Sequence, residues 1–273
     1  MNETTSTGEQ LPEYSIIDHL NDLRKMIMRS FLAVLLAGAV VFSAKEIVFD
    51  KILFAPLELD FVTYRFFCQI TDLLCIEKIP ITLISRQLQG QFVVHLWTAV
   101  YGGVILAFPY IVYEIWKFIS PGLYRNEKKT GVKFITITSV LFFIGIWFGY
   151  YVITPLVVNF LGNYQISDQV ENYVDIKSYI SNVRTTVLAN GITFELPVMI
   201  YFFTRMGLVD SGFLKRNRKY AVLVILILAA IITPPDVVSQ IIVAIPLLIL
   251  YEISIFVAKA IERKQSKELK PHS

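Results

Sequence analysis

Long runs of the chain contain no charged residue, and this feature constrains the fold more than any other. The runs 87–113 and 134–167 carry no Asp, Glu, Lys or Arg, and charged residues make up only 17% of the 273 residues. Soluble domains carry about a quarter charged residues. A helix of about 20 apolar residues can cross a bilayer. The chain is therefore predicted to be an all-α polytopic membrane protein.

Six apolar segments are long enough, or nearly long enough, to cross the membrane. They lie at 26–48, 87–113, 134–167, 185–204, 220–235 and 237–251. The last two are short, since 16 residues make about 24 Å of helix. They form either two short spans through thinned bilayer or one hairpin that dips in and returns. The Pro234-Pro235-Asp236 turn ends one helix and starts the next, which favours six transmembrane helices with the last two short.

The basic residues predict the orientation of these spans. If both termini and the loops 114–133 and 205–219 share one side, that side holds 18 of the 25 Lys and Arg residues and the other side holds 7. By the positive-inside rule both termini are cytoplasmic, N-in and C-in. The first 13 residues are neither a secretory signal nor a transit peptide, so a multi-pass protein of the bacterial inner (cytoplasmic) membrane is expected.

The spans divide the chain into a polar tail 1–14, a six-helix membrane domain 15–262 and a polar tail 263–273. An extracytoplasmic loop is expected at about 49–88 and contains the only cysteines, Cys68 and Cys75. These either form a disulfide, if that compartment is oxidising, or remain two thiols in an apolar segment.

Several functional classes lack their motifs in this chain. There is no Walker A, G-x-S-x-G, C-x-x-C or H-E-x-x-H sequence, and the three histidines lie far apart. No catalytic residue, metal site or cofactor is expected, and the chain is predicted not to be an enzyme. The net charge of +3 is too small to indicate nucleic acid as a partner.

Glu195 is the clearest intramembrane site, because it lies near the middle of an apolar segment, where a carboxylate is costly and usually functional. Asn190 and Thr193 are candidates to solvate it. Three roles are open: a protonated structural hydrogen-bonder, a contact for a partner's transmembrane helix or for membrane-thinning water, and a proton relay. The last would suit a secondary transporter of a small solute, the main alternative function, although such proteins usually contain internal repeats and none is detected.

Two acidic sites lie just outside the membrane on the predicted cytoplasmic side. Asp18 and Asp22 share a face of an amphipathic helix over 15–29, which by itself is expected to lie on lipid headgroups. Glu127 stands in a basic loop, where by itself it is expected to pair with a lysine. Together these carboxylates suit a peptide with two adjacent arginines, because guanidinium groups bind carboxylates in a bidentate way. A further alternative is a passive membrane scaffold that recognises no peptide. In such a scaffold, neutralisation of Asp22 and Glu127 would have no consequence.

Four motifs in order resemble those of the TatC family, the large signal-peptide-binding subunit of the twin-arginine protein translocase. They are the segment His19-Leu20-Asn21-Asp22-Leu23-Arg24-Lys25, the stretch 113–127 with its Ser-Pro-Gly break, Phe194-Glu195-Leu196-Pro197, and the stretch 233–240 that begins Thr-Pro-Pro-Asp. The resemblance covers about residues 14–262. Asp22 stands where the family usually has Glu, which keeps the charge but shortens the reach by one methylene.

The resemblance implies a receptor and core subunit of a Sec-independent export system, in which folded cargo crosses the membrane at the expense of the proton-motive force. Asp22 and Glu127 would bind the twin arginines of a cargo signal peptide. Phe118 and Pro56 match family positions tied to function.

The resemblance also implies partner subunits with a single span, of the TatA/TatB type. Glu195, Asp236 and Gln240 would contact these subunits within the membrane. Membrane lipid is a further partner, and self-association is a candidate interaction.

Overall fold

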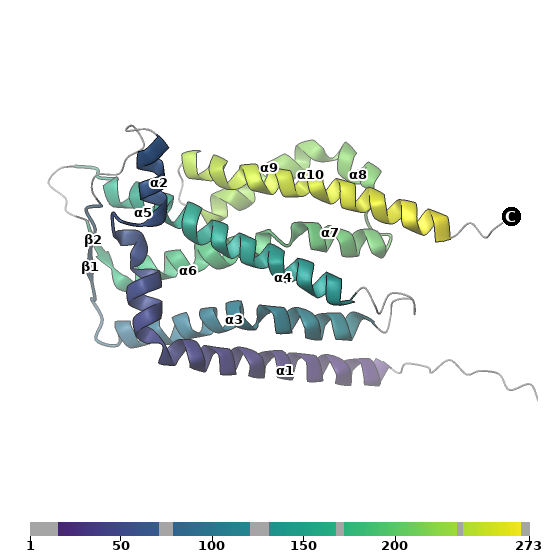
Figure 1. Ribbon diagram of the computed structural model, residues 1–273, viewed down its shortest axis with the longest axis horizontal. Coiled ribbons are helices and arrows are strands. Elements are labelled where there is room, and N and C mark those ends of the chain that lie inside the picture. The colour runs from purple at the N-terminus through teal and green to yellow at the C-terminus, as the bar shows by residue number, and fades with distance from the viewer. Residues whose placement is uncertain (1–15, 71–78, 121–130, 168–171, 234–236, 269–273) are drawn as a thin grey trace, which may run out of the picture.

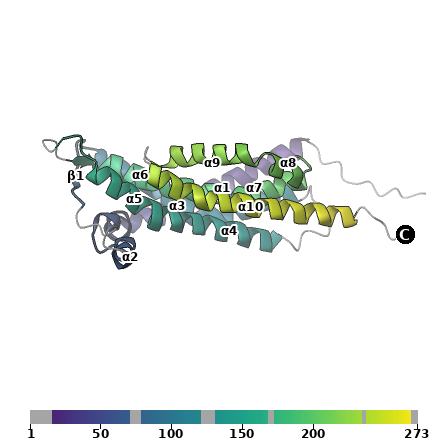
Figure 2. The same cartoon turned by 90° about the horizontal axis from the view of Figure 1, so that it is seen from above.

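The computed structural model describes residues 16–70, 79–120, 131–167, 172–233 and 237–268, and these are largely helical. The long helices lie side by side along the long axis of the molecule (Figures 1 and 2). The start of α1 (Ile16–Ser43) and the end of α10 (Val237–Glu268) lie at one end of this bundle, which we call the terminal end (Figure 1). The two-stranded sheet and α2 (Val62–Ile70) lie at the other end, called the sheet end.

The remaining elements follow in chain order. They are the π-helical η1 (Ile47–Leu53), the 3-10 turn η2 (Ala55–Leu57), β1 (Thr82–Ile84), α3 (Gly90–Ile119), α4 (Gly131–Phe148), the π-helical η6 (Gly149–Ile153), α5 (Thr154–Asn163), β2 (Tyr173–Asp175), α6 (Ile176–Thr193), α7 (Leu196–Arg205), α8 (Ser211–Arg216) and α9 (Arg218–Ile232). β1 pairs with β2 in parallel, so the starts of α3 and α6 meet at the sheet end.

Five helices of the described chain are long and apolar enough to cross a membrane. They are His19–Ser43, Gly90–Ile119, Gly131–Asn163, Ile176–Arg205 and Ser239–Arg263. The chain is therefore a membrane protein with several spans. The expected sixth span corresponds to α9, whose 15 residues make only about 22 Å of helix, so this span stays a prediction.

The expectation that the last helix is short was wrong. α10 has 32 residues, and the candidate membrane span within it runs from Ser239 to Arg263. The predicted span 237–251 ended just before Glu252. In the structure the helix continues past Glu252, whose carboxylate lies 2.7 Å from Nη2 of Arg218 on α9 in an exposed ion pair.

Glycines allow the closest helix contacts in the bundle. A Cβ at Gly103 of α3 would lie 2.6 Å from the Val34 carbonyl oxygen and 2.8 Å from the Gly38 nitrogen of α1. On the other side of the bundle, a Cβ at Gly145 of α4 would lie 2.7 Å from the Asn190 carbonyl oxygen of α6. Small residues at such points let membrane helices pack backbone to backbone.

The predicted loop at about 49–88 contains ordered structure at the sheet end. The buried Tyr64 hydroxyl of α2 donates hydrogen bonds to the carbonyl oxygens of Pro56 at 2.8 Å and Pro155 at 3.2 Å. One side chain therefore joins α2, η2 and the start of α5. Burial raises the pKa of Tyr64 well above its ordinary value, so the hydroxyl stays a donor.

Candidate functional site

The terminal end of α1 packs along the terminal end of α3 (Figure 1). The rings of His19 and Phe118 stack there with their centroids 4.4 Å apart. Asp22 follows His19 by one helical turn and keeps its side chain 47% exposed. The structure thus places the predicted site residue Phe118 against His19, one helical turn from the predicted site residue Asp22.

The exposed Asp22 carboxylate has one charged neighbour within the described residues. Lys25 on the same helix places its Nζ 3.8 Å from an Asp22 oxygen, and the lysine side chain is itself 62% exposed. Exposed ion pairs of this kind contribute about 0–1 kcal/mol. An incoming guanidinium group, which binds a carboxylate through two hydrogen bonds, can therefore replace the lysine at small cost.

A second carboxylate, Glu114, was not predicted as a site residue. Its side chain is only 5% exposed, and it lies 3.7 Å from Nη1 of Arg29 on α1. The Tyr110 hydroxyl donates to the same carboxylate at 2.9 Å. Arg29 lies within the predicted span 26–48, and Glu114 directly follows the predicted span 87–113. Two opposite charges at these positions could have indicated an ion pair between the two helices.

Two other predicted residues stand apart from this surface. Glu127 belongs to the segment 121–130, outside the described residues. Pro56 is buried in η2 at the sheet end, where its carbonyl accepts the Tyr64 hydrogen bond. α1 alone separates the two ends by about 42 Å, so Pro56 and Asp22 do not line one local pocket.

Glu195 lies at the interruption between α6 and α7, buried in the bundle. Neither carboxyl oxygen has a hydrogen-bond partner among the described residues. The expectation that Asn190 and Thr193 solvate it was wrong, because both side chains bond to their own helix. The amide of Asn190 donates to the Thr186 carbonyl at 2.8 Å, and the hydroxyl of Thr193 donates to the Ala189 carbonyl at 2.6 Å.

The other predicted membrane and loop residues are only partly described. Gln240 donates from its amide to the Leu226 carbonyl at 3.1 Å and so joins α10 to α9 within the chain. Asp236 lies outside the described residues. Cys68 is disulfide-bonded, and Cys75, the chain's other cysteine, lies outside the described residues.

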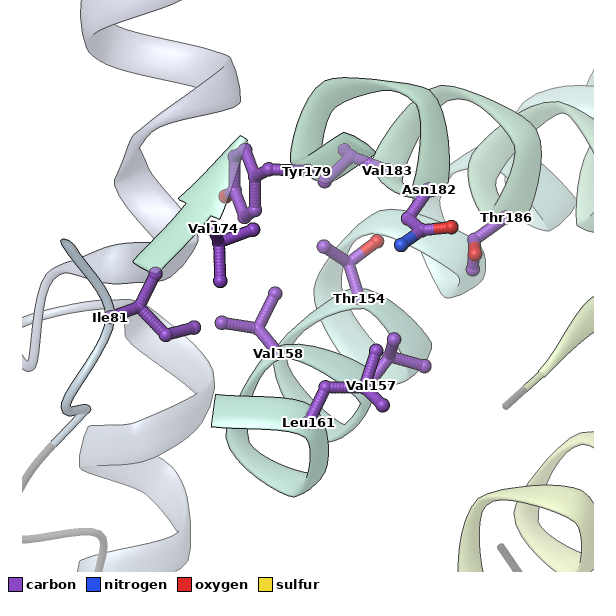
Figure 3. A pocket seen from close by; sticks show the side chains of 10 residues that line it. All are labelled: Ile81, Thr154, Val157, Val158, Leu161, Val174, Tyr179, Asn182, Val183 and Thr186. Atoms are coloured by element: carbon purple, nitrogen blue, oxygen red, sulfur yellow. The ribbon is translucent and has the colours of Figure 1, made fainter. Parts of the chain in front are cut away.

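Two cavities lined by described residues lie at the sheet end. One of about 50 Å³ lies between α5 and α6 and is lined mainly by apolar side chains such as Val157 and Val158 (Figure 3). The other, of about 520 Å³, is an open hollow beside His95 and Glu46. Glu195 lines neither cavity.

The proteins to which this chain is similar belong to the family that its four motifs resemble. The family model of the Sec-independent protein translocase protein (TatC) matches residues 18–246. The TatC protein of Blattabacterium sp. subsp. Periplaneta americana is 39% identical over 255 residues, covering 91% of this chain and 96% of the relative. The TatCy protein of Bacillus subtilis (strain 168) is 34% identical over 264 residues, covering 96% and 95%.

A solved structure has the same fold. The crystal structure of a twin arginine translocase receptor, TatC, superimposes with a TM-score of 0.70 at 32% sequence identity and covers 89% of this chain and 99% of that chain. A second crystal structure of that receptor, in the detergent DDM, gives the same TM-score and identity. The agreement in sequence and in fold extends over nearly the whole chain, which therefore belongs to the TatC family, a component of the Sec-independent protein translocase and not an enzyme.

Proposed function

We propose that this chain is the receptor and core subunit of a twin-arginine export system, and that it binds the twin-arginine signal peptides of folded cargo at its terminal end. The observation that carries the proposal is the exposed Asp22 carboxylate beside the His19–Phe118 stack. A similar solved protein is described as a twin arginine translocase receptor, which supports the same role.

In this proposal Asp22 binds one arginine of the peptide and Glu127 binds the other. The arginine next to Asp22 displaces the weakly held Lys25, because the guanidinium fork fits a carboxylate better than an ammonium group does. Phe118 offers its ring as an apolar surface for the residues beside the arginines. Pro56 acts at a distance, as part of the Tyr64 cluster that holds the sheet end together.

Glu195, Asp236 and Gln240 form the proposed contact for single-span partner subunits of the TatA/TatB type. The support for this contact is the Glu195 carboxyl, which lacks a partner among the described residues and lies within a span. A proton-coupled transporter of a small solute could use such a group. However, such transporters usually contain internal repeats, and none is detected in this sequence.

We place the chain in the bacterial inner membrane with both termini cytoplasmic and with α9 as a short sixth span. The distribution of Lys and Arg supports this orientation. The Cys68 disulfide is proposed to join Cys75 in the extracytoplasmic loop, and translocation is proposed to use the proton-motive force.

Crosslinking of a twin-arginine signal peptide to the protein in membranes tests the receptor role. Asp22→Asn and Glu127→Gln should each abolish capture, and a Lys-Lys peptide should not be captured by the native protein. Asp60→Asn is the matched control, because Asp60 is an exposed carboxylate paired with Arg65 at the sheet end. Equal capture of both peptides, or capture indifferent to both substitutions, would refute the proposal.

A further inference from the structure

Arg184 of α6 is a cation within a membrane span that has no counter-charge in the described chain. Its guanidinium carbon lies 4.9 Å from the centre of the Tyr101 ring of α3. The Nε and Nη1 atoms are buried and have no hydrogen-bond partner among the described residues. Intramembrane charges are costly, so an unpaired one indicates a missing ligand.

Arg184 shares one face of α6 with two other polar residues. Lys177, Ser181 and Arg184 are four and three residues apart, so they follow one another on successive turns. Lys177 is exposed, and the other two side chains are partly exposed. None of the ion pairs in the described chain includes Lys177 or Arg184. The nearby Asp175 carboxylate accepts hydrogen bonds from the backbone N–H groups of Arg86 and Lys177.

With the span centred in a bilayer, this face lies at the edge of the hydrocarbon core, next to the headgroups. Arg184 lies eight residues past Ile176, or about 12 Å along α6. The span Ile176–Arg205 has 30 residues, or about 45 Å, so about 7 Å of helix extends beyond each side of a hydrocarbon core of about 30 Å. Arg184 is then about 5 Å below the core boundary, a distance that an arginine side chain bridges by extending toward the headgroups.

Aromatic residues of α3 mark the same depth. Trp97 lies seven residues past Gly90, 52% exposed, and its ring is 6.4 Å from that of Tyr101. Exposed Trp and Tyr residues concentrate at the headgroup level of membranes. The cations and the aromatic belt therefore coincide at the sheet end.

We propose that Lys177, Ser181 and Arg184 form a binding site for the phosphate of an anionic phospholipid in the leaflet at the sheet end. The guanidinium group binds a phosphate oxygen with a charge-assisted hydrogen bond, the serine hydroxyl donates a further hydrogen bond, and the lysine adds charge from the water side. The lipid's acyl chains lie against Trp97 and the apolar residues that follow on α3 and α6. This site is independent of the peptide site at the terminal end.

Native mass spectrometry of the full chain, released from nanodiscs of phosphatidylcholine with phosphatidylglycerol, tests the proposal. The protein should retain phosphatidylglycerol, and Arg184→Gln should weaken this retention about tenfold or more, because a charge-assisted hydrogen bond is lost. Lys177→Gln, an exposed substitution that leaves the packing intact, should weaken it less. Arg65→Gln is the matched control, because it removes an arginine of α2 at the same end and should change nothing.

Three results would overturn the proposal. The first is unchanged phosphatidylglycerol retention in both Arg184→Gln and Lys177→Gln. The second is displacement of the lipid by inorganic phosphate added in detergent, which would make the site one for free phosphate. The third is a loss of copurifying single-span subunits in Arg184→Gln with the lipid still bound, which would assign the guanidinium to a partner carboxylate.

Discussion

Arg29 and Glu114 form an ion pair between α1 and α3, with Nη1 of the arginine 3.7 Å from a carboxylate oxygen. The pair lies one turn of α3 before Phe118 and two turns of α1 after Asp22. It joins the two helices that carry the described part of the proposed peptide site. The pair thus adds to the contacts between α1 and α3 that hold Asp22 and Phe118 near each other.

Removal of Arg29 should destabilise the protein. Arg29→Met leaves the buried Glu114 carboxylate with only the Tyr110 hydroxyl, which should lower the free energy of unfolding by about 2 kcal/mol. Arg29→Met with Glu114→Leu should cost less than the sum of the two single changes. The free energies of unfolding in detergent of the native protein, the two single variants and the double variant form a double-mutant cycle that measures the coupling between Arg29 and Glu114. The exposed pair Arg218–Glu252 is the control and should contribute about 0.2–1 kcal/mol; equal values for both pairs would contradict this account.

The close contact of α1 with α3 should not tolerate a larger residue at Gly103. In Gly103→Ala the new Cβ would lie 2.6 Å from the Val34 carbonyl oxygen, so α1 must move away. We expect a loss of about 1–3 kcal/mol in unfolding free energy and weaker capture of a twin-arginine peptide. Gly90→Ala is the control, since its Cβ would meet only ordinary contacts at 3.4 Å. A Gly103→Ala protein of native stability would show that the helices are free to separate.

Loss of the Tyr64 hydroxyl should loosen the sheet end. Tyr64→Phe leaves the buried carbonyls of Pro56 and Pro155 without this donor and should cost about 1–3 kcal/mol. Tyr164→Phe, at a residue with 62% exposure, is the control and should have little effect. Stability curves in denaturant distinguish the two variants.

The same tyrosine predicts a dependence on alkaline pH. Burial raises the folded-state pKa of Tyr64 above its ordinary value of 10.0, so its contribution is complete below pH 10 and is lost as the pH rises toward the folded pKa. The native protein should therefore lose stability above about pH 10, and Tyr64→Phe should reduce the slope of that loss. An identical slope in both proteins would assign the alkaline loss to other groups.

Replacement of Glu195 should affect assembly more than folding. Neither of its oxygens bonds to a described residue, so Glu195→Gln removes no hydrogen bond of the described chain. The free energy of unfolding should therefore stay the same or increase slightly. Copurification of a single-span partner subunit should decrease. Asn190→Leu is the contrasting variant, because Asn190 is fully buried and bonds to Thr186. If Glu195→Gln unfolds readily and still binds the partner, the residue is structural.

The sequence by itself determined the local features of this protein. Runs without charge predict spanning helices wherever they occur, because backbone polar groups in lipid must be satisfied within the helix. The four motifs and their order were sufficient to identify the TatC family. The position of Glu195 within a span follows from counting residues along the apolar segment. These properties depend on residues that are close together in the sequence, so they can be read from the sequence alone.

Tertiary structure decided which distant residues meet. Only the packing of α1 against α3 pairs Arg29 with Glu114, and only the fold shows that the Tyr64 hydroxyl joins Pro56 to Pro155. The contact of Glu252 on α10 with Arg218 on α9 is likewise visible only in the fold. The physical reason is the same in each case: the energy of a charge or a small residue in the membrane depends on what the fold places beside it, and that neighbour is far away in sequence.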